Sequence, residues 1–180
     1  KSGSRQVDFF VVTSVRAQLQ EQKELRGPVQ GGANGRWKVK DRSGAWILFE
    51  RAENPIEQVI ATKNALNDAM EKYQRKSGAS VPMALSGKYY KQFDTVVVAW
   101  PFLDPASEIR ADSQKARVRG YADAVRSLTA DSLASSWDLD HWKKFAEYMN
   151  LTPVALREAV DGAVFEAKRR IEIVLVRAES

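Results

Sequence analysis

The chain has no cysteine, a single histidine and no long apolar run. Without cysteine it can form no disulfide and hold no zinc through sulfur, so nothing indicates an oxidising compartment and we expect a cytoplasmic location. His141 is the one histidine, which excludes any site that needs a pair of them. No apolar stretch approaches the roughly 20 residues of a membrane-spanning helix, so we expect no membrane segment. The first residue is Lys rather than Met, and we therefore expect a piece of a longer, multidomain protein.

What the chain does have is enough apolar sequence for one folded domain and an uneven distribution of charge. Of its 180 residues 44% are hydrophobic, and 28 basic side chains stand against 23 acidic ones. Residues 1–90 carry 15 basic and 9 acidic side chains, whereas residues 91–180 carry 13 and 14. The positive excess therefore lies in the first half, which suggests a polyanionic partner such as nucleic acid. An ordinary solvated surface is the alternative.

The first half shows the patterns of short strands followed by a helix. Val7–Thr13 is rich in β-forming residues and Ala17–Lys23 alternates, so together they predict a hairpin about Ser14–Val15. Asn54 as N-cap and Pro55 at the first helical position predict the start of an amphipathic helix. Between hairpin and helix we expect a glycine-rich loop at Gly27–Gly35 and two short strands at Arg36–Lys40 and Ala45–Glu50.

The second half begins with a buried strand and then becomes mainly helical. Asp94–Trp100 is almost continuously apolar and β-branched, which is typical of a strand buried on both faces in the middle of a sheet. Gly120–Thr129 and His141–Leu151 predict short helices, and an apolar stripe predicts a long helix from Thr152 to Val174. The long helix is also a candidate surface for pairing into a homo-oligomer. We therefore expect one layered α/β domain.

Ionisable residues that suggest a catalytic site lie at one end of the predicted hairpin. If Ser14–Val15 is a two-residue turn, Asp8 lies directly opposite Glu21, with the two Cβ atoms about 4.5–5.5 Å apart. Period-two alternation puts Lys23 on the same face of the hairpin as Glu21. That face is apolar near the turn and ionic at its open end.

The pair Asp8 and Glu21 needs a compensating positive charge, because opposed carboxylates repel each other. A divalent cation would supply it, since Mg²⁺ is usually bound through one or two carboxylates plus waters and phosphate oxygens. Lys23 is a second source of positive charge. A metal, two acids and a lysine suit phosphodiester hydrolysis, in which the lysine positions the attacking water or offsets charge developing on the phosphate. A solvated cross-strand ion cluster without catalysis is the alternative that these residues leave open.

The surrounding sequence resembles the nuclease-related domain, or NERD, of the PD-(D/E)XK nucleases. The resemblance covers approximately residues 5–130. It rests on Gln6–Val7–Asp8 opening a strand, Glu21–Gln22–Lys23 ending the next, a glycine-containing loop, a strand bearing Trp37, and Asn54–Pro55–Ile56–Glu57–Gln58 opening a helix. It implies a restriction-endonuclease-like fold for residues 1–130, a mixed central sheet flanked by helices. Residues 131–180 are then expected to be a helical C-terminal extension packed on the same domain.

The resemblance also implies DNA as the substrate and Mg²⁺ or Mn²⁺ as the cofactor. By position, Asp8 and Glu21 would hold the metal, Lys23 would assist the attacking water, and Gln58 would approach the site or the DNA. A solvent-facing glutamine is the alternative for Gln58. Gln6 stands where the family often has an acid, and the family's upstream helix would precede the first residue. These departures motivate a second hypothesis, a degenerate nuclease fold that binds DNA or a protein partner.

A basic strand and several aromatic residues complete the sequence-based expectations. Arg36, Lys38 and Lys40 alternate with Trp37 and Val39, so they share one strand face and are candidates to line a DNA backbone. A polar outer face with Trp37 in the core is the alternative. We expect His141 at the surface, and we expect core positions for Trp100, Trp137 and Trp142.

Overall fold

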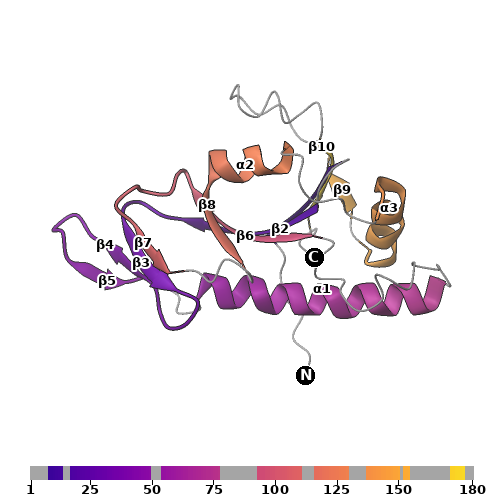
Figure 1. Ribbon diagram of the computed structural model, residues 1–180, viewed down its shortest axis with the longest axis horizontal. Helices are drawn as coiled ribbons and strands as arrows, with labels where there is room; N and C mark the ends of the chain where they lie inside the picture. Colours follow the sequence, from indigo (N-terminus) through magenta and orange to yellow (C-terminus); the bar gives the residue numbers. More distant parts are fainter. Residues whose placement is uncertain are drawn as a thin grey trace.

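The structure is a computed structural model in which residues 8–13, 17–49, 54–77, 93–110, 116–129, 137–150, 152–154 and 171–176 are described. These residues form two mixed β-sheets and three helices (Figure 1), which confirms the expected α/β class in its general form. None of the three helices is long and apolar enough to cross a membrane. The helices are α1 (Pro55–Ser77), α2 (Tyr121–Thr129) and α3 (Leu139–Tyr148). The strands are β1 (Phe9–Thr13), β2 (Ala17–Glu24), β3 (Val29–Gly32), β4 (Lys38–Lys40), β5 (Trp46–Leu48), β6 (Asp94–Trp100), β7 (Glu108–Arg110), β8 (Arg117–Gly120), β9 (Thr152–Val154) and β10 (Ile171–Val176).

The central sheet has the strand order β8-β6-β2-β1-β10-β9. β1 and β2 form the predicted antiparallel hairpin, while β6 lies parallel to β2 and β8 lies parallel to β6. α1 lies between β2 and β6 in the chain and supplies the crossover that a parallel pair requires. The apolar sequence of β6 is explained by its place inside the sheet, since Val96, Val97, Val98 and Ala99 are all fully buried.

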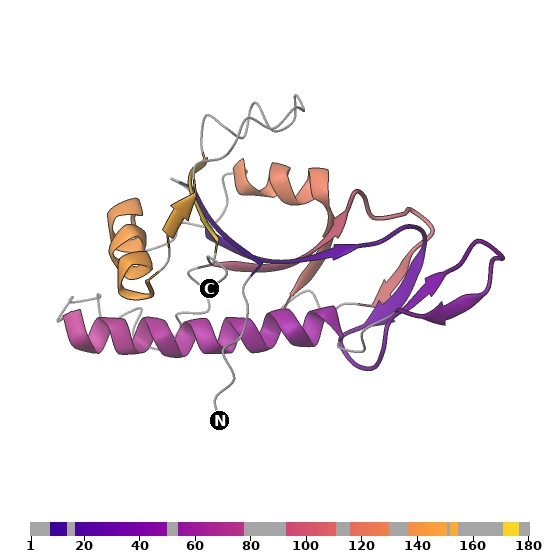
Figure 2. The same ribbon diagram turned by 180° about the vertical axis from the view of Figure 1, so that it is seen from behind.

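Helices cover both faces of the central sheet. α1 lies along one face and α2 along the other, as the two opposite views of Figures 1 and 2 show. Alternation along β1 sorts its side chains between these layers. Phe10 packs in the core that includes α1 and α3, whereas Val11 packs against Leu128 of α2. The α1 side is closed by aromatic contacts, in which the ring of Tyr73 lies 5.6 Å from that of Phe145 in α3.

The start of α1 is built as the sequence predicts. The Asn54 side chain accepts the backbone N–H of Ile56 at 2.9 Å and so caps the helix. Its amide nitrogen also donates to the carbonyls of Gly32 and Gly35, at 2.9 and 2.8 Å. Asn54 is 3% exposed. One buried side chain therefore holds the helix start and the turn after β3 together.

A second sheet, of order β5-β4-β3-β7, forms one end of the molecule (Figure 1). The predicted hairpin of β4 and β5 is confirmed, and Asp41 Oδ1 accepts the backbone N–H groups of Ser43 and Ala45 in its turn. The Ser43 hydroxyl, which donates to the same oxygen at 2.6 Å, and the Ala45 amide hold the pKa of the Asp41 carboxyl below its ordinary value. The expected loop over Gly27–Gly35 is wrong in part, because Val29–Gly32 is strand β3.

The long helix expected from Thr152 to Val174 is wrong at both of its described ends. Thr152–Val154 and Ile171–Val176 are strands, and β10 pairs with the edge of β1 that β2 leaves open. The β-branched residues of IEIVLV suit this position better than a helix. Pro153 is tolerated because β9 is an edge strand. The C-terminal residues therefore extend the central sheet, which corrects the expectation of a purely helical extension.

Trp137 and Trp142 are core residues as expected, with 5% and 1% of their surface exposed. Trp100 is not, because β6 ends there and the side chain is 46% exposed. Its ring packs against Tyr121 of α2, with centroids 4.8 Å apart. His141 lies at the surface as expected, and its ring nitrogen Nδ1 is 2.8 Å from the carboxylate of Asp138, the residue that caps α3. The backbone N–H of His141, which donates to the Asp138 carboxylate at 2.9 Å, and then this ring contact lower the pKa of Asp138.

Candidate active site

The predicted register of the β1–β2 hairpin is confirmed. Phe9 pairs with Gln20, and the ladder continues to Val12 opposite Ala17. Continued by one residue beyond Phe9, the same register sets position 8 opposite position 21. The turn residues 14–16 lie outside the described residues.

Asp8 lies just before the first residue of β1, with its side chain directed at β2. Its Oδ2 accepts the backbone N–H of Gln22 at 2.8 Å, and the residue is half-buried. This amide belongs to the residue between Glu21 and Lys23, so the hydrogen bond anchors the Asp8 carboxylate beside both of them. Asp8 therefore lies at the same end of the hairpin as Glu21 and Lys23.

Glu21 and Lys23 form an ion pair on one face of β2. The Lys23 Nζ lies 2.5 Å from Glu21 Oε1, and the two side chains are 20% and 11% exposed respectively. Their parallel partners on β6 are Val97 and Ala99, which belong to the core shared with α1. The pair therefore lies on the α1 side of the central sheet. Such a shielded pair adds little net stability, because the loss of water offsets the attraction, but removing either partner leaves a costly charge behind.

The opposite face of β2 carries a feature that sequence reasoning missed. Gln18 and Gln20 are 0% and 8% exposed. Gln20 Nε2 donates to Gln18 Oε1 at 2.6 Å, and Gln18 Nε2 donates to the Ser127 hydroxyl of α2 at 3.0 Å. The sequence feature that could have indicated this is the alternation of glutamines along the strand. If both faces of the strand are covered, such side chains need buried hydrogen-bond partners.

α1 brings two polar side chains to the layer beneath the sheet. Gln58 lies in the first turn, is half-buried, and has its side-chain Oε1 shielded from solvent. The oxygen of the Gln58 amide is therefore turned away from solvent, while the residue as a whole is half-buried. Lys63 was not singled out from the sequence, although it lies one turn after Val59 on the buried stripe. Burial lowers the pKa of the Lys63 ammonium, and the Asp94 carboxylate at the start of β6 opposes this shift.

The predicted basic strand lies on the second sheet. Arg36, Lys38 and Lys40 are exposed, while Trp37 is 2% exposed. The Trp37 indole donates to the carbonyl of Gly32 at 3.1 Å and lies over Gly31, where any Cβ would approach its ring to 2.5 Å. Trp37 is therefore a core residue, and the three cations lie on a surface separate from the carboxylates of the central sheet.

The donor set at the hairpin end fits a magnesium or manganese ion with few protein ligands. Asp8 and Glu21 offer hard carboxylate oxygens, and Mg²⁺ commonly uses one or two of these with waters and phosphate oxygens. The part of the chain that the structure describes contains no cluster of three or more His, Asp or Glu side chains suited to a metal. Any ion here would therefore depend on water and substrate for most of its coordination.

Comparisons of the chain with protein-family models, with curated proteins and with solved structures found no match.

Proposed function

We propose that this protein is a divalent-metal-dependent DNA nuclease domain of a larger protein, with a restriction-endonuclease-like fold of the NERD type. The observation that carries the proposal is the Asp8 carboxylate bonded to the Gln22 amide, beside the Glu21–Lys23 pair. The topology supports it as well. An antiparallel hairpin is followed by a crossover helix and a parallel strand, so the acidic end of the hairpin lies in a mixed sheet flanked by helices.

In this proposal Asp8 and Glu21 hold the metal ion and Lys23 acts next to it. When bound, the ion would polarise the scissile phosphate and lower the pKa of a bound water. The Lys23 ammonium, already held by Glu21, would donate a hydrogen bond to the attacking water or offset charge developing on the phosphate oxygens. Beside the pair lie the buried residues Val97 and Ala99 of β6. Gln58 would act from the α1 side on the substrate or on these side chains.

Plasmid cleavage tests the proposal. Supercoiled DNA is expected to be cut with Mg²⁺ or Mn²⁺ and to stay intact with a chelator. Lys23→Ala is expected to abolish cleavage, whereas Lys72→Ala, at an exposed position of α1, is expected to cleave like the parent protein.

Folding must be checked in the same experiment, because Lys23→Ala leaves a shielded carboxylate without its cation. Asp8→Asn is a second variant, since an amide oxygen can still accept the Gln22 N–H while the charge is lost. Thermal melting reports whether each variant folds. Parental cleavage rates in both folded variants would remove the assignment.

A degenerate nuclease fold that binds DNA or a protein partner is the second candidate function. It is favoured by the small number of metal ligands among the described residues and by the engagement of Glu21 with Lys23. Titration calorimetry separates the two functions. A measurable Mg²⁺ or Mn²⁺ site supports the nuclease, whereas salt-sensitive DNA binding without any metal site supports the degenerate fold.

A further inference from the structure

One face of the second sheet combines exposed aromatic, aliphatic and basic side chains. The pairing of β4 with β5 sets Lys40 beside Trp46 and Lys38 beside Leu48. Residues paired in this way point to the same side of the sheet. The Lys40 Nζ lies 5.8 Å from the centroid of the Trp46 ring, as this arrangement requires. Trp46 and Leu48 are 37% and 50% exposed, so this side is open to solvent.

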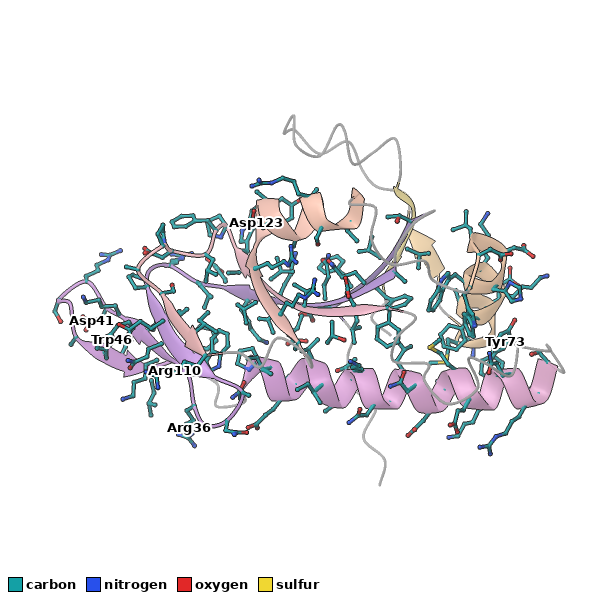
Figure 3. All side chains as sticks on the ribbon, in the orientation of Figure 1. Arg36, Asp41, Trp46, Tyr73, Arg110 and Asp123 are labelled. Carbon is teal, nitrogen blue, oxygen red and sulfur yellow. The ribbon has the colours of Figure 1, made fainter. Side chains whose placement is uncertain are left out.

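The same face continues across β3 onto β7. Gln30 pairs with Lys38 on one side and with Glu108 on the other, and its side-chain amide donates to Glu108 at 3.0 Å. Gly32 pairs with Arg110, which places that exposed arginine on the same side. We call this surface the outer face; it consists of Gln30, Gly32, Lys38, Lys40, Trp46, Leu48, Glu108 and Arg110. Figure 3 shows Trp46, Arg110 and Arg36 at this end of the molecule.

The opposite side of the second sheet is packed over β3 and β7, whereas Ile47 of β5, which pairs with Val39 on that side, is 46% exposed. Val29 is 0% exposed, and Val39 and Ile109 pack against the main core. Trp37 covers Gly31 there. The sheet therefore has an apolar inner face, whereas the outer face holds three cations and one acid, Glu108, which is tied to Gln30.

The chemistry of the outer face fits a flexible polyanion with flat apolar groups. An exposed indole on an open sheet offers a stacking surface for an unpaired base, and neighbouring lysines and arginines neutralise phosphates. Bases inside a duplex are already stacked and do not offer their faces to a flat sheet. An acidic peptide would satisfy the cations, but it would gain less from the exposed ring.

We infer that the outer face binds single-stranded nucleic acid, with Trp46 stacking on a base and with Lys38, Lys40 and Arg110 contacting the backbone. The inference adds a binding surface to the proposed function. The choice of DNA rather than RNA as the physiological ligand rests on that proposed function. The inference assigns unpaired DNA, at an end, flap or gap, as the segment that the second sheet holds. Arg36, exposed two residues before β4, extends the same basic surface.

Fluorescence anisotropy with labelled dT20 in a chelator tests the inference without any cleavage. The parent protein is expected to bind dT20 more tightly than a 20-base-pair duplex. Trp46→Ala is expected to weaken dT20 binding about tenfold or more, and Trp46→Phe is expected to restore most of it, because a phenyl ring still stacks. Trp100→Ala, which removes a similarly exposed tryptophan at the end of β6, is the matched control and is expected to bind normally.

The outcomes separate this inference from the nuclease proposal. Trp46-dependent dT20 binding in a protein that cuts no DNA would retain the outer face as a binding surface and overturn the nuclease. Cleavage with normal dT20 binding by Trp46→Ala would retain the nuclease and overturn the outer face. Equal binding of rU20 supports recognition of unpaired bases and phosphates in either nucleic acid, whereas duplex binding tighter than dT20 binding contradicts the inference. Displacement of dT20 by polyglutamate, with no effect of Trp46→Ala, identifies a surface for acidic peptides instead.

Discussion

The two sheets of this protein differ in how exposed their charged side chains are. In the central sheet, the Glu21 side chain is 11% exposed and bonded to Lys23, and Asp8 is anchored to a backbone amide. In the second sheet, Lys38, Lys40 and Arg110 extend from an open face. Shielded charges are expensive and need defined partners, whereas exposed charges cost little. On this difference rest our proposals of chemistry in the first region and of binding in the second.

The largest expected effect is the separation of cleavage from binding. Glu21→Gln should lower the rate of DNA cleavage by about a thousandfold, because it removes a metal-binding carboxylate charge and weakens the hold on Lys23. Its affinity for dT20 in a chelator should be that of the parent protein. Kinetics on plasmid DNA and anisotropy on dT20 measure the two quantities. A parallel loss of both would show that the regions do not act separately.

The second effect concerns stability. Leu19→Ala in β2 should lower the free energy of unfolding by about 2–5 kcal/mol, because Leu19 is 1% exposed and its truncation leaves a cavity. Leu48→Ala on the outer face should change it by less than about 0.5 kcal/mol. Urea denaturation measures both. Equal losses would mean that the outer face is covered in the folded protein.

Asn54→Ala tests the connection between the second sheet and α1. The change removes the helix cap and both side-chain bonds to the 32–35 turn, so we expect a loss of about 1–3 kcal/mol in the free energy of unfolding. Asp138→Ala removes the exposed cap of α3 and should cost about 1 kcal/mol or less. Thermal melts compare the two variants, and a larger loss from Asp138→Ala would contradict the bridging role of Asn54.

The smallest effect is on the salt dependence of binding. Lys38→Ala should weaken dT20 binding a few-fold and reduce the slope of log affinity against log salt by about 0.7, because one phosphate contact is lost. Lys72→Ala has the same loss of charge on α1 and should leave the slope unchanged. Anisotropy titrations at several salt concentrations provide the slopes. Indistinguishable slopes for the two variants would remove Lys38 from the binding surface.

Much of the central sheet follows from local sequence. The hairpin register, the buried strand Asp94–Trp100 and the start of α1 at Asn54–Pro55 are each encoded within a short segment. Residue patterns of this length specify local geometry because strand alternation and helix capping act between near neighbours. The neighbourhood of Asp8, Glu21 and Lys23 was predictable for this reason.

Two wrong predictions, the C-terminal helix and the loop at β3, concern segments whose structure depends on distant partners. The apolar pattern of Ile171–Val176 is compatible with a helix or with a strand. The segment is a strand because it pairs with the open edge of β1, which is far away in the chain. The glycines at positions 31 and 32 predict a loop where the structure has strand β3. Gly31 is instead needed under Trp37, and Gly32 pairs with Arg110 of the distant β7.

The sequence by itself determined the hairpin with its acids and lysine, the capped helix, the buried strand and the alternating cations of Arg36–Lys40. Only the tertiary structure decided that Gln18 and Gln20 of β2 are buried on the α2 side. It also decided that β10 joins the central sheet and that Arg110 and Trp46 share one exposed face. The physical reason is that period-two alternation along a strand predicts which of its side chains share a face. Pairing between distant strands decides whether that face is buried or exposed, and against which residues it packs. The candidate chemistry was therefore local, and the candidate binding surface was not.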